Sequence, residues 1–269
     1  MLINIANHDF MIIWDGVYYF ALSDYPNVSD WELRKLVTFF DYEKRHGRET
    51  EIYCENDEIK KTVETALSDP APYMAVQRPR LITECTACRH GGCLTDYVCH
   101  TAEIENAKSI FICGKILSAA KARGMTGAEL ATEPRNAAKD PPDYLEHAMF
   151  AWGNCQAGDR LVMERTLGRA PDERDLSAGF TPGVRFWFKY ETVENHRNFV
   201  NDGYHPAKVR DELPLSGNLY RCVIPGDRKD EFAGVIPPDL ADRVFYIDND
   251  CGDIWEWSEK VYNCVVSTV

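Results

Sequence analysis

The first 80 residues alternate between strand-like and helical patterns of apolar positions. The apolar runs INIANHDFMIIW and VYYFAL predict strands, and Asp15-Gly16 between them favours a hairpin turn. SDWE at 29–32 is a capping-box pattern, and apolar residues follow it at helical spacing up to Gly47. TEIYCEN predicts a further strand and NDEIKKTVETALSD a second helix. Residues 1–80 are therefore predicted to form a small α/β unit that ends in the proline-containing segment DPAPYMAVQRPR.

The pattern changes beyond a Cys-rich linker at 81–93. LTDYVCHT predicts a strand, EIENAKSIFICGKILSAAKARG a helix, and TGAELATEPRNAAKDPPD a long polar loop. Helices are expected for DYLEHAMFAW and AGDRLVMERTLG. Strands are expected for GVRFWFKY, LYRCVIP, RVFYID and WSEKVYNCVV. Residues 94–269 are thus predicted to be an α+β domain with helices packed on a mixed or antiparallel sheet.

Composition and charge narrow the classes of protein to consider. The chain has 269 residues, 45% of them apolar and 27% charged, which is typical of a globular protein. A net charge of −13 disfavours a general nucleic-acid binder, although it does not exclude an enzyme that acts on a nucleic-acid base. The N-terminus lacks a basic region of the secretory type, and no apolar run reaches the roughly 18 residues that span a bilayer. Ten cysteines without such a signal indicate reduced thiols in a cytoplasmic protein without membrane contact.

Cysteine and histidine residues cluster in the linker and the strand after it. Cys85, Cys88, Cys93 and Cys99 followed by His100 give the spacing C-x2-C-x4-C-x5-C-H. The first pair has the two-residue gap with which two thiolates reach one tetrahedral zinc ion. The second half of the cluster is irregular, so free thiols are the alternative interpretation. A zinc-knuckle interaction protein without catalytic activity is one of the functions considered.

A cysteine nucleophile is a further possibility. WGNCQAGDR places Cys155 among small and polar residues, and His147, His196 and His205 are available elsewhere in the sequence. A Cys–His hydrolase needs a thiolate and an imidazole that are distant in sequence and close in space. Free cysteines are often simply buried, so the sequence leaves this alternative open.

Five short motifs occur in order after residue 94. YVCHT ends the first strand of this part, a helix ends at Gly114 with Leu117 just beyond, and GVRFWF, LYRCVIP and WSEKVYNCVV follow. This order resembles the ADP-ribosyltransferase superfamily, particularly its histidine-type branch, which includes the poly-ADP-ribose polymerases and the bacterial DarT-like enzymes. In that branch the first strand ends in a histidine, a later strand carries an aromatic residue, and a strand near the end carries a catalytic glutamate. The resemblance covers about 94–269 and leaves the N-terminal unit unexplained.

The resemblance implies a role for particular residues. His100 with Thr101 would hold the adenosine ribose of NAD, and Glu259 would accept a hydrogen bond from the nicotinamide-ribose hydroxyl, with Glu256 as its competitor. His100 would then face a cofactor cleft with Glu259 across it, and Cys99 would point to the opposite face of the strand. The candidates for stacking on nicotinamide are Phe186, Trp187 and Tyr190; a tyrosine is usual in the family where Phe and Trp stand here. The arginine candidates for binding the pyrophosphate are Arg123, Arg135, Arg160 and Arg185.

The chemistry explains why these residue types are needed. Breaking the nicotinamide–ribose bond develops positive charge on the sugar, which a carboxylate aimed at the 2′-hydroxyl stabilises in the transition state. No GxGxxG follows a strand, so a Rossmann-type hydride carrier is not expected. The resemblance thus implies a mono-ADP-ribosyltransferase with NAD as substrate and a nucleic acid or a protein as acceptor. A bacterial toxin or a phage-defence effector is the implied role, with an antitoxin as its partner.

Overall fold

The chain folds into two compact units. The computed structural model describes residues 1–8, 11–74, 96–134, 136, 138–177 and 180–267, together with the backbone of 81–82 and 93–94. Unit 1 comprises Met1–Thr95, Asn136–Pro141 and Asn201–Pro206, and unit 2 comprises Asp96–Arg135, Pro142–Val200 and Ala207–Val269. The two short segments that unit 1 takes from the later chain have no signal in the hydrophobic pattern.

Unit 1 is a four-stranded mixed sheet with helices. The strands lie in the order β2-β3-β1-β4, with β1 parallel to β3 and β4 and β2 antiparallel to β3. The predicted hairpin turn is confirmed, because Asp15 and Gly16 both adopt positive φ, 49° and 77°. The predicted capping box is also confirmed at the start of the first helix. The elements are β1 (Leu2–Ala6), β2 (Ile12–Trp14), β3 (Val17–Ala21), α1 (Asp30–Arg45), β4 (Glu51–Tyr53), α2 (Asp57–Ser68) and α3 (Ala71–Met74).

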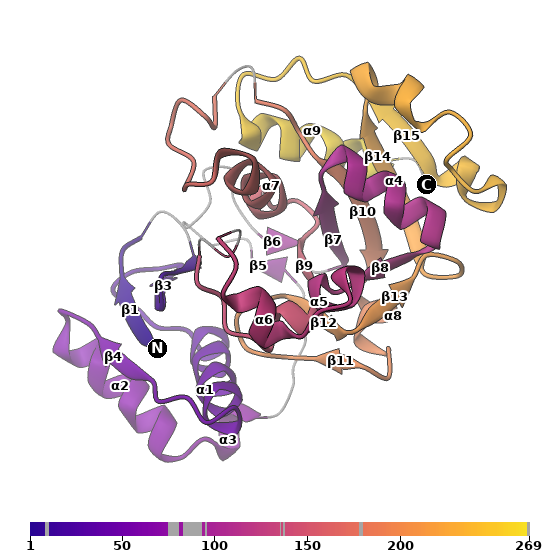
Figure 1. The fold of residues 1–269 in the computed structure, drawn as a ribbon. Helices are drawn as coiled ribbons and strands as arrows, with labels where there is room; N and C mark the ends of the chain where they lie inside the picture. Colours follow the sequence, from indigo (N-terminus) through magenta and orange to yellow (C-terminus); the bar gives the residue numbers. More distant parts are fainter. Residues whose placement is uncertain are drawn as a thin grey trace. The chain divides into compact units, whose positions relative to one another are not determined.

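Unit 2 contains a seven-stranded, mostly antiparallel sheet (Figure 1). Its strands lie in the order β11-β12-β9-β7-β10-β14-β15, and of its ladders that between β14 and β15 is parallel. The strands are β7 (Tyr97–Ala102), β9 (His147–Trp152), β10 (Val184–Lys189), β11 (Phe199–Val200), β12 (Ala207–Arg210), β14 (Leu219–Pro225) and β15 (Val244–Ile247). A smaller ladder of unit 2 pairs β8 (Lys115–Leu117) with β13 (Glu212–Pro214), and in unit 1 β5 (Leu81–Ile82) pairs with β6 (Cys93–Leu94).

Helices accompany this sheet, and the chain as a whole is a mixed α+β protein, as predicted. The α-helices are α4 (Ile104–Cys113), α5 (Ala119–Arg123), α6 (Gly127–Ala131), α7 (Ala157–Leu167), α8 (Tyr190–Glu194) and α9 (Ile254–Ser267). Three 3-10 helices are η1 (Tyr144–Glu146), η2 (Gly226–Phe232) and η3 (Pro238–Arg243). In the described ranges, no helix combines the length and the apolar character needed to cross a membrane.

Alternate side chains of β7 and β10 reach two apolar clusters on opposite faces of the sheet. We call the side covered by α4 the α4 face, and the side covered by α9 the α9 face (Figure 1). The α4-face cluster includes Val98, Ala102, Phe111, Phe186 and Phe188. The α9-face cluster includes Cys99, Trp187, Val223, Trp257 and Val261. These faces decide which of the predicted site residues can meet.

Three of the predicted helices and strands are wrong, and the predicted loop TGAELATEPRNAAKDPPD contains helix α6. DYLEHAMFAW, expected to be helical, forms η1 and then strand β9, because its apolar residues are buried between β7 and β12. WSEKVYNCVV, expected to be a strand, lies in helix α9, which Asp253 begins by accepting hydrogen bonds from two backbone amides. The helix expected from EIENAKSIFICGKILSAAKARG is interrupted after Gly114, which ends α4 in the left-handed conformation.

Candidate functional site

The neighbouring strands β7 and β9 are hydrogen-bonded to each other over only part of their length. Their ladder consists of two pairs, Val98 with Trp152 and Cys99 with Ala151. Beyond this point β7 continues against β10 as far as Ala102, whereas β9 runs against β12. We call the place where the ladder ends the fork. His100 is the next residue of β7 and therefore stands at the fork.

Beyond the last ladder pair, the imidazole of His100 connects β7 to β9 by a hydrogen bond. Its Nδ1 lies 3.0 Å from the backbone oxygen of Met149 in β9, and its ring makes an edge contact with Phe150 at 5.9 Å. A carbonyl oxygen can only accept, so Nδ1 carries the proton and Nε2 is the acceptor nitrogen. The pKa of His100 is lowered to about 4, chiefly by burial; the hydrogen bond to Met149 opposes this shift, and the positive charge of Arg165 adds to it. The ring is therefore neutral at neutral pH.

This pKa predicts how stability depends on pH. His100 has an ordinary pKa of 6.5 when unfolded and about 4 when folded. Between these values the unfolded chain binds more protons, so the free energy of unfolding falls as the pH is lowered through this window and levels off below it. We expect urea denaturation of His100→Gln to show a weaker decline over the same window. An NMR titration in which the ring of His100 protonates near its ordinary pKa would contradict this.

Thr101 points away from His100. A Cβ on Gly158 of α7 would lie 2.1 Å from Thr101 Oγ1, so the Thr101 side chain packs closely on α7. The Cys99 thiol shares this face, 4.0 Å from Thr101 Oγ1, and burial raises its pKa to about 12. The expectation that Cys99 and His100 occupy opposite faces is confirmed. His100 and Thr101 consequently cannot contact one ligand from the same face of β7.

Arg185 lies in the interior of unit 2. Its guanidinium and the Asp159 carboxylate are both fully buried; Nε donates to Asp159 Oδ2 at 2.7 Å, and Nη2 bonds the same oxygen. Asp159 Oδ1 accepts from the backbone nitrogen of Gly183 at 2.9 Å, and Arg185 Nη2 donates to Ser258 Oγ at 2.5 Å. These contacts tie β10 to α7 and α9. They form a structural network in the interior, which does not favour Arg185 as a pyrophosphate ligand.

The other three arginine candidates have different surroundings. Arg123 is paired with Glu133 at the surface. Arg160 lies in the first turn of α7. Arg135 falls outside the described residues.

The three aromatic candidates are all buried. Phe186 packs on Phe111 of α4 at 5.2 Å between ring centroids. Trp187 lies in the α9-face cluster, and its indole nitrogen donates to the oxygen of Gly153 at 3.2 Å. Tyr190 begins α8 and stacks on Trp152, with centroids 5.5 Å apart. All three rings are thus occupied by core packing, and Trp152 is a partner that the sequence patterns did not indicate.

The two glutamate candidates lie on a helix and not on a strand. Glu256 is exposed in the first turn of α9 and accepts from the backbone nitrogen of Gly252 at 2.7 Å. Glu259 is also exposed, while the buried face of α9 packs on the α9 face of the sheet. His100 projects from the opposite face, by the alternation of β7. The expected approach of Glu259 to His100 across a cleft is therefore not found.

Sequence reasoning missed two buried carboxylates on α7. The side chains of Asp159 and Glu164 are only 1% and 6% exposed. Their helix packs against β7 and β9. Glu164 directly precedes Arg165, whose charge acts on His100. The sequence contains no clear signal for this burial, because Asp and Glu are mostly exposed and are rarely buried unless they are paired.

Cys155 and the three candidate histidines each have a local contact. Cys155 Sγ accepts from the backbone nitrogen of Ala157 at 3.4 Å. Nδ1 of each candidate histidine contacts a local partner: the oxygen of Asp143 for His147, the nitrogen of Asn198 for His196, and the Asp202 carboxylate for His205. These contacts hold each of the four side chains within its own segment.

The zinc hypothesis concerns residues that are mostly outside the described structure. Cys85 and Cys88 lie outside it, and only the backbone of Cys93 is described. His100, a possible further ligand, uses Nδ1 for Met149. Within the described part of the chain, no group of three or more His, Cys, Asp and Glu side chains is arranged to hold a metal ion.

Comparison with known proteins does not assign the chain to a family. Neither the protein-family models, nor the curated proteins, nor the solved structures contain a match. The residues at the fork are therefore the basis on which a function can be inferred.

Proposed function

We propose that this chain is an ADP-ribosyltransferase that consumes NAD, and that the reaction takes place at the fork, beside His100. The observation that carries the proposal is the state of the His100 ring: half-buried, neutral, and fixed by Met149 through Nδ1. A neutral imidazole held in this way presents Nε2 as an acceptor for a ribose hydroxyl. The order of motifs around His100, which resembles the histidine-type transferases, supports the same function.

In the proposed reaction the bond between C1′ of the ribose and the nicotinamide nitrogen breaks, and nicotinamide leaves with the bonding electron pair. The acceptor then bonds to C1′ and loses its proton. A carboxylate near the sugar would stabilise the positive charge that develops in the transition state. Glu259 is not assigned this role, because α9 packs on the face of the sheet opposite to the His100 side chain.

The test is release of nicotinamide. The purified chain is incubated with NAD labelled in its adenylate part, with and without cell lysate, and free nicotinamide is measured by chromatography. His100→Ala is expected to lower the rate about 100-fold, the usual effect of deleting one preorganised hydrogen-bonding group. Nuclease or protease treatment of the labelled product then separates a nucleic-acid acceptor from a protein acceptor.

Matched variants make the assignment specific. His196→Ala removes another half-buried histidine of unit 2 and should leave the rate unchanged. Glu259→Gln should retain the activity, because Glu259 lies on α9, on the other face of the sheet from His100. An equal rate of nicotinamide release by the wild type and by folded His100→Ala would refute the proposed site, and no release by the wild type with any acceptor fraction would refute the activity.

A further inference from the structure

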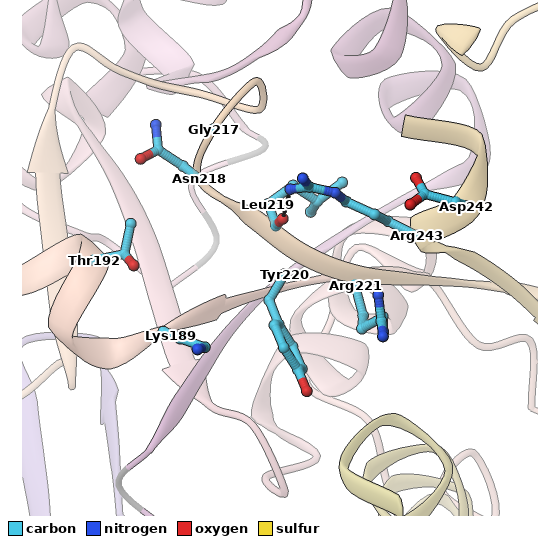
Figure 2. A pocket seen from close by; sticks show the side chains of 9 residues that line it. All are labelled: Lys189, Thr192, Gly217, Asn218, Leu219, Tyr220, Arg221, Asp242 and Arg243. Carbon is cyan, nitrogen blue, oxygen red and sulfur yellow. Dashed lines mark hydrogen bonds between the residues drawn. The ribbon is translucent and has the colours of Figure 1, made fainter. Parts of the chain in front are cut away.

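A pocket of about 430 Å³ lies in unit 2 at the start of the β14–β15 ladder (Figure 2). The ladder begins with Cys222 opposite Val244, and the residues just before both strands border the pocket. Its lining consists of Lys189, Thr192, Gly217, Asn218, Leu219, Tyr220, Arg221, Asp242 and Arg243. None of the residues assigned to the proposed transferase reaction is among them.

An irregularity in β14 sets the direction of two of these side chains. Trp187 of β10 is opposite Arg221, but Phe188 is opposite Leu219, so Tyr220 is an extra residue in β14. A bulge of this kind places two consecutive side chains on one side of a strand. Figure 2 shows the Tyr220 and Arg221 side chains extending from the same side of β14. Bulges are often found where a binding site needs a side chain to be re-aimed.

Three cations line this pocket. Lys189 Nζ lies 5.7 Å from the centre of the Tyr220 ring, and the Arg221 guanidinium carbon lies 5.1 Å from the same point. Arg243 donates through Nη1 to the backbone oxygen of Leu219. Among the described residues, no carboxylate forms an ion pair with any of these three side chains. The only acid in the lining, Asp242, is exposed.

Arg221 adds an unsatisfied donor. Its Nε is buried and has no hydrogen-bond acceptor among the described residues. A buried donor without an acceptor is costly, and the cost is greater for a charged group. This local surplus of positive charge contrasts with the net charge of the whole chain, which is −13. An anionic ligand would satisfy both the charge and the donor.

From these contacts we propose that the pocket binds the phosphate group of a small molecule. The planar donor set of arginine matches phosphate oxygens, and lysine adds a point charge. The volume is within the range of pockets that hold small ligands. The half-exposed ring of Tyr220 offers an apolar surface beside the cations. This site is independent of the fork and of the proposed transferase reaction.

Calorimetry of the full chain with two probes, inorganic phosphate and AMP, tests the proposal. Both are expected to bind the wild type, with affinity that falls as salt is added. Lys189→Gln and Arg221→Gln are each expected to weaken binding at least tenfold. Arg169→Gln should bind as the wild type does, because Arg169 is a surface arginine of unit 2 that is paired with Asp175 and lies outside the pocket.

The two probes distinguish the source of the phosphate. Equal affinities would assign the pocket to free phosphate, and tighter binding of AMP would assign it to a phosphate attached to a nucleoside; either supports a phosphate site. Lys189 is exposed at the end of β10, so its variant is expected to fold and to be informative even if Arg221→Gln is unstable. Absence of binding to the wild type, or unchanged binding in Lys189→Gln, would overturn the proposal.

Discussion

Replacing Asp159 with alanine is expected to lower the free energy of unfolding by about 3–5 kcal/mol, the usual effect of breaking a buried ion pair. The substitution removes the carboxylate that accepts from Nε and Nη2 of Arg185 and from the backbone nitrogen of Gly183. The Arg185 side chain is 0% exposed, so its charge would be left without this partner and without water. Urea denaturation followed by circular dichroism measures the loss.

Two further variants show whether the loss comes from the isolated charge. Asp175→Ala breaks the surface pair between Asp175 and Arg169 and should change stability far less, because solvent screens exposed charges. The double variant Asp159→Leu with Arg185→Met removes both charges and should recover much of the lost stability. If Asp159→Ala and Asp175→Ala were equally stable, the buried pair of Asp159 and Arg185 would not stabilise the fold more than a surface pair does.

Replacing Gly203 with alanine is expected to destabilise unit 1 by about 2–5 kcal/mol. Gly203 has a φ of +73°, which costs about 1–2 kcal/mol for a residue with a side chain. A Cβ there would also lie 2.3 Å from the backbone oxygen of Lys35 and 2.5 Å from the backbone nitrogen of Phe39. Backbone atoms of α1 cannot move aside as a flexible side chain does, so overpacking adds about 1–3 kcal/mol. Urea denaturation and amide exchange in α1 report the change.

Gly47 provides the matched control. It also lies in unit 1 and has a similar φ of +70°, but a Cβ there would meet nothing within 4 Å. Gly47→Ala should therefore show the conformational cost alone, about 1–2 kcal/mol. Equal destabilisation by the two substitutions would mean that the close approach to α1 contributes nothing.

Local patterns predicted the elements whose signals are local. The capping box at Ser29 and the turn at Asp15 depend on residues within four positions of each other, and both are found in the structure. The motif with a helix end at Gly114 agrees with the end of α4, where glycine adopts the left-handed conformation, whereas the longer helix predicted through this glycine was wrong. The α+β class follows from such elements, and it was predicted correctly.

The errors arose where the surroundings decide the structure. HAMFAW contains residues that favour helices, yet two neighbouring strands bury it as β9. The β-branched residues of WSEKVYNCVV suggested a strand, while the buried positions Ile254, Trp257, Val261 and Val265 repeat at helical spacing. Because of this second error, Glu256 and Glu259 were expected on a strand, whereas they lie on helix α9. The fork could not be predicted, because the register between β7 and β9 is set by pairing across about fifty residues of sequence.

Unit 1 is built from segments that are far apart in the sequence, and this affects its folding during translation. The segments Asn136–Pro141 and Asn201–Pro206 belong to this unit, and they supply the Ala138 oxygen that accepts from Asp15 and the Tyr204 hydroxyl that accepts from Ile13. On the ribosome, the first 95 residues emerge long before these partners have been translated. The N-terminal unit must therefore wait for the nascent chain to pass residue 206 before its last contacts can close. An expression fragment cut after residue 95 would lack them permanently.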